Sequence, residues 1–274
     1  MQTIILMAAC WFAFAVPAFG QGNSDAGAQV GAAESASGKV QTYEIVSIKP
    51  NKPGSGSGGM SLLPDGFEWR SVGLYSLVQA AYGIIMDSQV SGLPSWARSE
   101  PYDIVAKADP ATVERWKKLT PEERWAEEQP MMRAILTDRC QFKAHLETKE
   151  LPVYDLVIAG GGLKMREARP GEDASEQMTG AGRIKAQAVQ VDLIALVFTR
   201  TLGRIIVDKT GLGSRKFDFD LKWTPDYQPA ADEPADAAPS LLIALQEELG
   251  LKIVSSKGPV QVLTIDHMGR PSPN

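Results

Sequence analysis

The sequence predicts an α+β fold built from two tandem pseudo-repeats, each roughly β-α-β-α-β-β, with helices packed on a mainly antiparallel sheet. A strand-like segment leads directly into an amphipathic helix at residues 66–82, and the same succession recurs at residues 182–198. In both places a Gly-Leu turn and another strand-like segment follow, and then a further helix and two more strand-like segments. Because repeated modules usually form scaffolds and binding surfaces, this pattern lowers the expectation of an enzyme.

Composition narrows the class of protein and its partners. The chain has 274 residues, of which 44% are hydrophobic and 22% are charged, as in ordinary globular proteins of one or two domains. Its formal net charge is −5. Nucleic-acid binding needs a basic surface to neutralise phosphates, so we expect no nucleic-acid partner. The same charge argues against binding to anionic membrane surfaces.

The N-terminus predicts export. Residues 4–16 form an apolar run, and Ala18 and Gly20 fit a signal-peptidase site, so residues 1–20 are expected to be a signal peptide cleaved before Gln21. The run is short for a transmembrane helix, and we expect no stable membrane insertion after cleavage. No Lys or Arg precedes the run, which leaves a retained N-terminal anchor as the alternative. The expected location is periplasmic or extracellular.

The first repeat is expected at residues 41–165, after a flexible linker at 21–40 that is rich in Gly, Ala, Ser and Gln. Alternating patterns predict strands at 43–50, 67–72 and 102–108, the second pairing with the first. The Gly- and Ser-rich residues 51–59, between the first two of these strands, are expected to be a surface loop. Apolar residues at helical spacing predict a helix of about ten residues between the second and third strands.

The rest of the first repeat is expected to be helical and then to form a hairpin. Thr120-Pro121-Glu122-Glu123 is typical of a helix start. The nearby Trp116 and Trp125 are expected to pack on the domain rather than to be exposed for ligand binding. Residues 142–147 and 153–158 are expected to pair as a hairpin. Cys140 is the only cysteine once the signal is removed, so we expect no internal disulfide and interpret this thiol as core filler.

The second repeat is expected at residues 182–268, after a polar linker at 166–181. An acidic Pro- and Ala-rich stretch at 226–239 is expected to be an inserted loop. After it, Ser240 is placed to cap a helix, which is followed by the last strand-like segments. Residues 269–274 are expected to be a tail.

Catalytic motifs are sparse, and no cofactor-binding motif and no metal site are predicted. A zinc site needs three or four ligands, which the histidines and the lone remaining cysteine do not supply at a metal-binding spacing. Asp208-Lys209 follows a strand-like segment, where a turn with side-chain hydrogen bonds is the favoured interpretation over a catalytic pair. Asp266-His267 follows the last strand. Neighbouring residues of a strand point to opposite faces, so these two cannot act as a catalytic pair if the strand continues, and a cap at the end of the strand is favoured.

Several segments, taken together, point to one family. They are Tyr43–Pro50, Ala81-Tyr82-Gly83, Pro94-Ser95-Trp96, Tyr102–Lys107, Val207–Leu212, Phe217-Asp218, Leu221–Pro225, Leu245–Lys252 and Ile265-Asp266-His267. As a set, over about residues 42–274, they resemble a large family of uncharacterised secreted proteins of soil bacteria of the acidobacterial type. The resemblance implies secretion and carries no known activity or catalytic residues. More loosely, the second repeat is similar to the short β–α–β modules of secretins and TonB-dependent receptors, which bind proteins.

The sequence therefore predicts an exported, non-enzymatic envelope protein that binds a protein or peptide through exposed sheet edges or a groove between the repeats. The candidate binding anchors are Trp69, Trp96 and Trp223, with core packing as the alternative. Two other classes stay open: a small-molecule sensor with one apolar pocket between the repeats, and a hydrolase. The hydrolase would use Asp208, Lys209, Asp266 and His267. The oligomeric state does not follow from the sequence.

Overall fold

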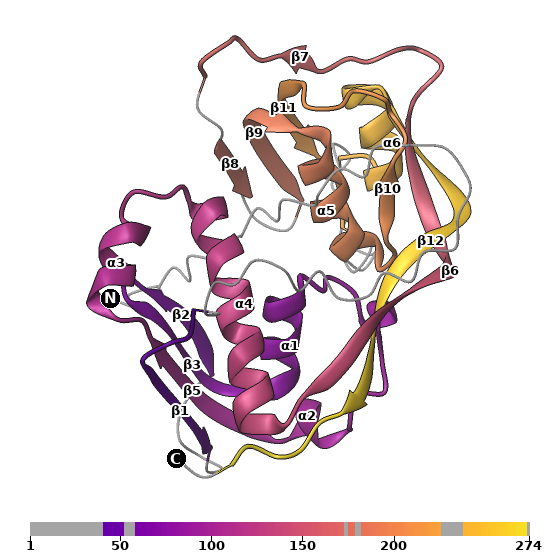
Figure 1. The fold of residues 1–274 in the computed structure, drawn as a ribbon. Helices are drawn as coiled ribbons and strands as arrows, with labels where there is room; N and C mark the ends of the chain where they lie inside the picture. Colours follow the sequence, from indigo (N-terminus) through magenta and orange to yellow (C-terminus); the bar gives the residue numbers. More distant parts are fainter. Residues whose placement is uncertain (1–40, 52–57, 173–174, 179–181, 226–237, 273–274) are drawn as a thin grey trace, which may run out of the picture. The chain divides into compact units, whose positions relative to one another are not determined.

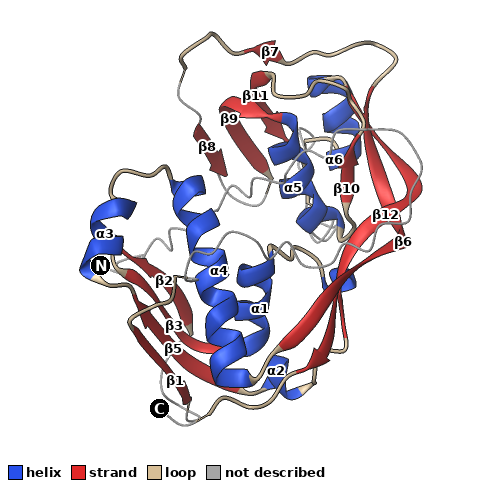
Figure 2. Ribbon diagram, viewed as in Figure 1, coloured by secondary structure: helices blue, strands red, loops and turns tan. Residues whose placement is uncertain are grey.

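The fold is α+β, with three mostly antiparallel sheets and six α-helices in the part of the chain that the structure describes (Figures 1 and 2). This computed structural model describes residues 41–51, 58–172, 175–178, 182–225 and 238–272. The predicted signal peptide, the 21–40 linker and most of the 226–239 loop lie outside them. No helix in these ranges is long and apolar enough to cross a membrane.

The chain divides into two compact units. Unit 1 comprises Met1–Glu147 and Gln261–Asn274, and unit 2 comprises Thr148–Val260. Two strands contain the unit boundaries: β6 (Lys143–Ile158) and β12 (Leu251–His267). The chain therefore passes between units inside strands and not through loops.

Unit 1 contains an antiparallel sheet in the order β1-β5-β3-β2. Its strands are β1 (Ile45–Pro50), β2 (Gly59–Leu63), β3 (Gly66–Gly73) and β5 (Pro101–Lys107). Buried and half-buried positions alternate along β5, as expected for a strand with one face on a core. The prediction that residues 67–72 pair with the first strand is wrong, because β5 lies between β1 and β3. A nonlocal strand inserts there, which local alternation does not reveal.

Helices cover one face of this sheet (Figure 2). They are α1 (Leu74–Tyr82), α2 (Trp96–Ser99), α3 (Pro110–Trp116) and α4 (Pro121–Cys140). The predicted start of α4 is confirmed: the Thr120 hydroxyl accepts the Glu123 N–H, and the Glu123 carboxylate accepts the Thr120 N–H. This reciprocal capping satisfies two donors that a helix start leaves without a partner. Cys140 is fully buried at the end of α4, in agreement with its role as core filler.

Unit 2 contains an antiparallel sheet in the order β7-β11-β9-β8, with its own apolar core. The strands are β7 (Arg166–Glu167), β8 (Ser175–Met178), β9 (Arg183–Gln190) and β11 (Lys216–Lys222). The helices α5 (Val191–Leu202) and α6 (Leu241–Ala244) pack on it, and a π-helical turn, Leu245–Leu249, continues α6. Gly250 ends that turn in the left-handed conformation, the usual way for glycine to terminate a helix.

The third sheet has the order β10-β6-β12-β4, with the short strands β4 (Val90–Ser91) and β10 (Ile206–Asp208) at its edges. Each edge strand runs parallel to its neighbour. The predicted hairpin at residues 142–158 is wrong, because β6 is one continuous strand. Its middle residues Thr148–Leu151 include no glycine or asparagine to turn the chain, and Pro152 is tolerated within the strand. Residues 251–265, expected to be two strands, likewise form one.

A matching irregularity occurs in the two antiparallel sheets. β3 and β9 each contain a β-bulge with a non-glycine residue at positive φ, Ser71 at 52° and Ala188 at 51°. The Ser71 N–H donates to Oδ1 of Asp103 on β5 at 2.9 Å, and the Ala188 N–H donates to Oδ1 of Asp218 on β11 at 2.7 Å. Positive φ is uncommon outside glycine, so two bulges of this kind with an Asp acceptor are a specific shared feature.

Candidate functional site

Two of the predicted tryptophan anchors lie in cores. Trp69 and Trp223 are each only 4% exposed. The Trp69 ring lies 4.7 Å from that of Phe67, and the Trp223 ring contacts Phe198 edge-on at 5.6 Å. These two side chains have little surface to offer a partner, which favours the core-packing alternative for both.

Trp96, the third predicted anchor, is half-buried on α2. The guanidinium of Arg270 lies over its ring at 5.2 Å, and that guanidinium also forms an ion pair with Glu100. Part of the Trp96 surface is thereby covered by the C-terminal residues of unit 1.

The polar residues of the alternative enzyme hypothesis belong to different units: Asp208 and Lys209 to unit 2, and Asp266 and His267 to unit 1. Asp208 Oδ1 accepts the N–H of Thr210 at 2.8 Å, which is the turn interpretation of this segment. Asp266 is hydrogen-bonded to a histidine other than His267, its neighbour in the sequence.

That histidine is His145 on β6. Its Nδ1 is hydrogen-bonded to Asp266 at 3.0 Å and its Nε2 to Glu147 at 2.8 Å. The two carboxylates, with Asp266 the larger influence, raise the pKa of His145. Because both ring nitrogens are occupied by carboxylates, the imidazole is not positioned to activate a hydroxyl or thiol. Across the described residues, no group of three or more His, Cys, Asp or Glu side chains could hold a metal ion.

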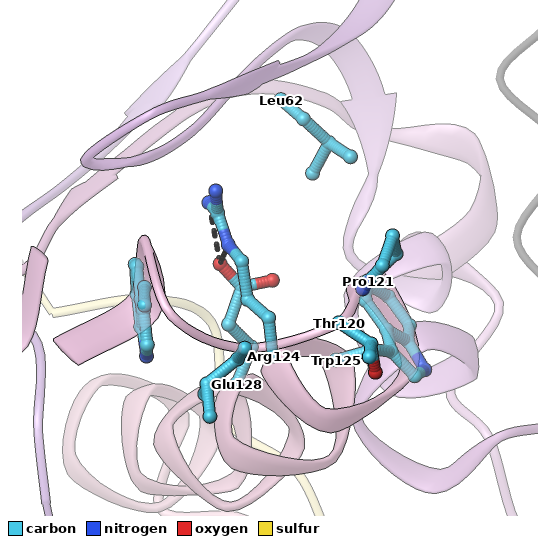
Figure 3. A pocket seen from close by; sticks show the side chains of 8 residues that line it. Leu62, Thr120, Pro121, Arg124, Trp125 and Glu128 are labelled. Atoms are coloured by element: carbon cyan, nitrogen blue, oxygen red, sulfur yellow. Dashed lines mark hydrogen bonds and ion pairs between the residues drawn. The ribbon is translucent and has the colours of Figure 1, made fainter.

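A pocket of about 260 Å³ opens in unit 1 between the edge strand β2 and the start of α4 (Figure 3). Leu62 of β2 lies across it from the α4 side chains. Most of its walls are aromatic or aliphatic, and its polar groups come from α4 and the residue that caps it. The lining residues are Leu62, Trp116, Leu119, Thr120, Pro121, Arg124, Trp125 and Glu128.

The polar part of this pocket is a paired cation and anion. Arg124 donates to Oε1 of Glu128 from Nε at 3.1 Å and from Nη2 at 2.9 Å, while the Glu128 side chain is only 2% exposed. Nη2 of Arg124 also donates to the carbonyl of Leu63 at 2.7 Å, which links α4 to the end of β2. The same guanidinium lies 4.6 Å from the centre of the Trp116 ring. Burial raises the pKa of Glu128, and Arg124 opposes that shift.

Tyr43 adds a buried polar atom near this pair. Its hydroxyl is buried and has no hydrogen-bond partner among the described residues. Burial, with a smaller contribution from Glu128, raises the pKa of Tyr43, so the phenol is neutral at physiological pH. The pocket therefore combines apolar walls with charges that already neutralise each other.

Among the described residues, the strand beside the pocket, β2, pairs on one side only, with β3, and its other side is an open edge. The two-residue Pro64-Asp65 turn connects β2 to β3, and Leu63 is paired with Gly66. Residues that flank such a turn exchange hydrogen bonds, and the alternation of an antiparallel ladder then gives Ser61 an inward position and Met60 and Leu62 outward ones. The outward N–H and C=O groups of these two residues make no backbone hydrogen bond within the described part of the chain.

The side chains of this edge are apolar and exposed. Met60 is 56% exposed and Leu62 is 39% exposed, although their partners on β3, Trp69 and Phe67, are buried under the helices. The helical layer therefore stops short of β2. Native sheets usually protect an edge with charges, Pro or a bulge, and Gly59–Leu63 contains no charged residue and no Pro.

The sequence carries signals for this site. The loop predicted at residues 51–59 ends before Met60-Ser61-Leu62, which alternates and precedes Pro64-Asp65-Gly66, a strong turn signal. The Arg124–Glu128 pair, in which Glu128 is buried and Arg124 half-buried, has the helical i, i+4 spacing, which normally marks a solvent-exposed pair. Its burial depends on β2 and α3, which the sequence did not place beside it.

The comparisons with known proteins give a family and no function. Residues 75–268 match the family described as "Protein of unknown function (DUF3738)", so the chain belongs to that family. The matched region includes α4 and begins after β2. Neither a curated protein nor a solved structure is significantly similar to the chain. The bacterial source and the likeness to secretin and TonB-receptor modules stay predictions.

Proposed function

We propose that this member of the DUF3738 family is an exported, non-enzymatic binding module that takes up an extended segment of a protein or peptide in the cell envelope. The observation that carries the proposal is the open, uncharged edge of β2 beside the Arg124–Glu128 pocket. Addition of a strand to a sheet edge is a common mode of peptide recognition, in which main-chain hydrogen bonds supply affinity and pockets supply specificity.

The size of the pocket supports a side chain as its occupant. Pockets for drug-sized ligands usually have volumes of about 300–1,000 Å³. At about 260 Å³ this pocket lies below that range, and it opens beside a strand edge. Its lining comes from unit 1 alone, whereas the sensor hypothesis required a pocket between the two repeats. A partner segment that places one side chain in the pocket fits better than a free metabolite.

Export is part of the proposal because a secreted binding protein would meet its partners in the envelope. Its support is the apolar run at residues 4–16, followed by small residues at a signal-peptidase spacing. No observation favours the hydrolase, since the contacts of Asp208 and Asp266 are those of a turn and of a histidine with both nitrogens occupied.

The proposal includes two copies of one module. Matching sheet orders, β1-β5-β3-β2 and β7-β11-β9-β8, support it. So do the paired bulges at Ser71 and Ala188, each with an Asp acceptor on the neighbouring strand. In both copies a helix follows the bulged strand at once and ends at a left-handed glycine, Gly83 or Gly203.

Peptide display against the immobilised protein tests the binding function. Peptides enriched on the wild type should bind the variants Met60→Pro and Leu62→Lys at least tenfold more weakly. The proline removes an N–H that points away from β3, so the ladder with β3 is kept, and an edge strand tolerates it. The lysine leaves the backbone intact and adds a charge to the edge.

Ser61→Ala is the matched control, because the Ser61 side chain faces the opposite side of the sheet from Met60 and Leu62. It should bind like the wild type. Circular dichroism and melting temperature would establish that each variant is folded. Enriched peptides that bind both edge variants as tightly as the wild type, or no enrichment over an unrelated protein, would refute the proposal.

A further inference from the structure

We infer that the segment bound at β2 is an antiparallel strand with an apolar-x-apolar pattern, whose first apolar side chain, an uncharged aromatic or aliphatic one, enters the Arg124–Glu128 pocket. The inference rests on the proposed function and adds the direction, register and chemistry of the partner. Three features of β2 and of the pocket carry it.

The first feature is the direction of the backbone N–H and C=O groups of Met60 and Leu62. Met60 and Leu62 direct both N–H and C=O away from β3. An antiparallel partner can place one residue opposite each of them, and every such pair exchanges two hydrogen bonds. The partner then makes four main-chain hydrogen bonds through residues two apart. The strand pairs β1–β5, β5–β3 and β3–β2 of this sheet are all antiparallel, and antiparallel pairing is slightly more stable per residue than parallel pairing.

The second feature is the face on which side chains lie. Residues directly opposite each other in a ladder share a face. The partner residues opposite Met60 and Leu62 therefore lie on the helix-covered side, beside two exposed apolar side chains. The residue between them lies on the other face with Ser61, where Glu68 and Arg70 form an exposed ion pair. This produces the apolar-x-apolar pattern.

The third feature is the chemistry of the pocket. Leu62 lines it and Met60 does not, so the partner residue opposite Leu62 is the one beside the pocket. In an antiparallel strand that residue precedes the one opposite Met60. Because Glu128 is already paired with Arg124, the pocket has no net charge to offer an incoming ion. A buried charge without a partner is costly, whereas an apolar side chain gains from the walls of Trp116, Trp125 and Pro121.

A synthetic peptide with single backbone methylations tests this register. The probe is acetyl-Ser-Thr-Phe-Thr-Leu-Thr-Ser-amide carrying a fluorophore at its C-terminal end, with binding to the full protein followed by fluorescence anisotropy. N-methylation of the Phe or of the Leu removes an N–H that points to β2, and each should weaken binding at least tenfold. N-methylation of the central Thr removes an N–H that points away and should change the affinity less than threefold.

Side-chain replacements test the pocket. Changing the Phe of the peptide to Glu or to Lys should weaken binding at least tenfold, while changing the central Thr to Glu should have little effect. In the protein, Leu62→Ala should weaken the binding of the Phe peptide, and Ser61→Ala should leave it unchanged. A peptide with Phe and Leu exchanged should bind more weakly, since the larger ring is then displaced from the pocket.

The outcomes separate this inference from the proposed function. If the peptides enriched by display depend on Met60 and Leu62 but carry charged residues opposite Leu62, the inference is wrong and the proposed function stands. A loss of binding on methylation of the central Thr, with the Phe and Leu methylations tolerated, overturns the register in the same way. If no peptide distinguishes the wild type from Met60→Pro and Leu62→Lys, the function and the inference fail together.

Discussion

The guanidinium of Arg124 holds the buried carboxylate of Glu128 with two hydrogen bonds, at 3.1 and 2.9 Å, one turn apart on α4. The pair is spaced like a surface ion pair but forms part of a pocket, because Trp116 and the end of β2 enclose it. Charges in such a position cost desolvation energy and tolerate the loss of a partner poorly. A substitution at either residue should therefore affect both the stability of unit 1 and the candidate binding pocket.

Arg124→Met should destabilise the protein by about 3 kcal/mol at pH 7, since it leaves Glu128 buried without its counter-charge. Burial already raises the pKa of Glu128, and the substitution removes the group that opposes this rise. A carboxyl whose pKa is higher in the folded than in the unfolded state binds protons on folding, so it lowers stability as the pH rises above its ordinary value of about 4.5. Urea unfolding should therefore show a smaller deficit at pH 5 than at pH 8.

The double variant Arg124→Met with Glu128→Leu provides the control for that prediction. It removes both charges and replaces them with apolar side chains, which should recover most of the lost stability and remove the pH dependence of the deficit. A double variant as unstable as Arg124→Met alone would show that the arginine acts mainly through packing on Trp116 and its bond to the Leu63 carbonyl.

Asp103→Ala and Asp218→Ala should each cost about 1–2 kcal/mol, because each removes the acceptor of a bulge N–H held at positive φ. Equal losses, measured by urea unfolding, are what two copies of one module predict. Since Asp103 also accepts a hydrogen bond from Asn51 and Asp218 one from Arg166, Asn51→Ala and Arg166→Ala measure those separate contributions. If Asp218→Ala leaves the free energy of unfolding unchanged while Asp103→Ala lowers it strongly, the two aspartates do not have equivalent roles.

The pH dependence of the bulge in unit 1 has a definite sign. Hydrogen bonds from the Asn51 side chain and then from the Ser71 N–H lower the pKa of Asp103. A carboxyl with a lowered folded pKa stabilises the fold above its unfolded value of about 3.8, and this contribution disappears as the pH falls through the folded value. Melting curves between pH 5 and pH 2.5 should show a shallower loss for Asp103→Ala than for the wild type, and parallel curves would contradict this.

His145 should make unit 1 less stable as the pH rises above neutrality. Its pKa is raised by Asp266 and Glu147, so the charged imidazole favours the fold. The contribution is fully present below the unfolded value of about 6.5 and is lost as the pH rises through the folded value. His145→Gln should reduce the change in melting temperature between pH 6 and pH 9. His267→Gln is the matched control, and an unchanged slope in His145→Gln would contradict the prediction.

Thiol titration tests both the core and the processing of the chain. Cys140 is buried, and burial raises the pKa of its thiol to about 11, so it should not react with Ellman's reagent in the native protein. The sequence contains one other cysteine, Cys10. Protein recovered after export should therefore titrate one thiol in urea if residues 1–20 are removed. Two thiols would show that the apolar run is retained.

The local pattern of the chain was sufficient for several elements. Periodicity predicted α1, β5 and the 182–198 strand–helix segment, and capping residues predicted the start of α4 at Thr120. These features depend on contacts within a few residues, which the sequence states directly. The α+β class follows from them.

Strand order and the candidate site were decided by tertiary structure. β5 inserts between β1 and β3, and β6 continues through the place where a turn was expected, because pairing with distant strands outweighs local signals. The pocket brings Leu62 to Arg124, and no periodicity joins residues so far apart in the chain. Local pattern therefore identifies many of the helices and strands, though not β2, β7 or β8, and it places Cys140 in the core. The burial of Trp69, the terminal position of β2 in its sheet and the enclosure of the Arg124–Glu128 pair follow from tertiary contacts, since burial depends on which elements come to lie beside one another.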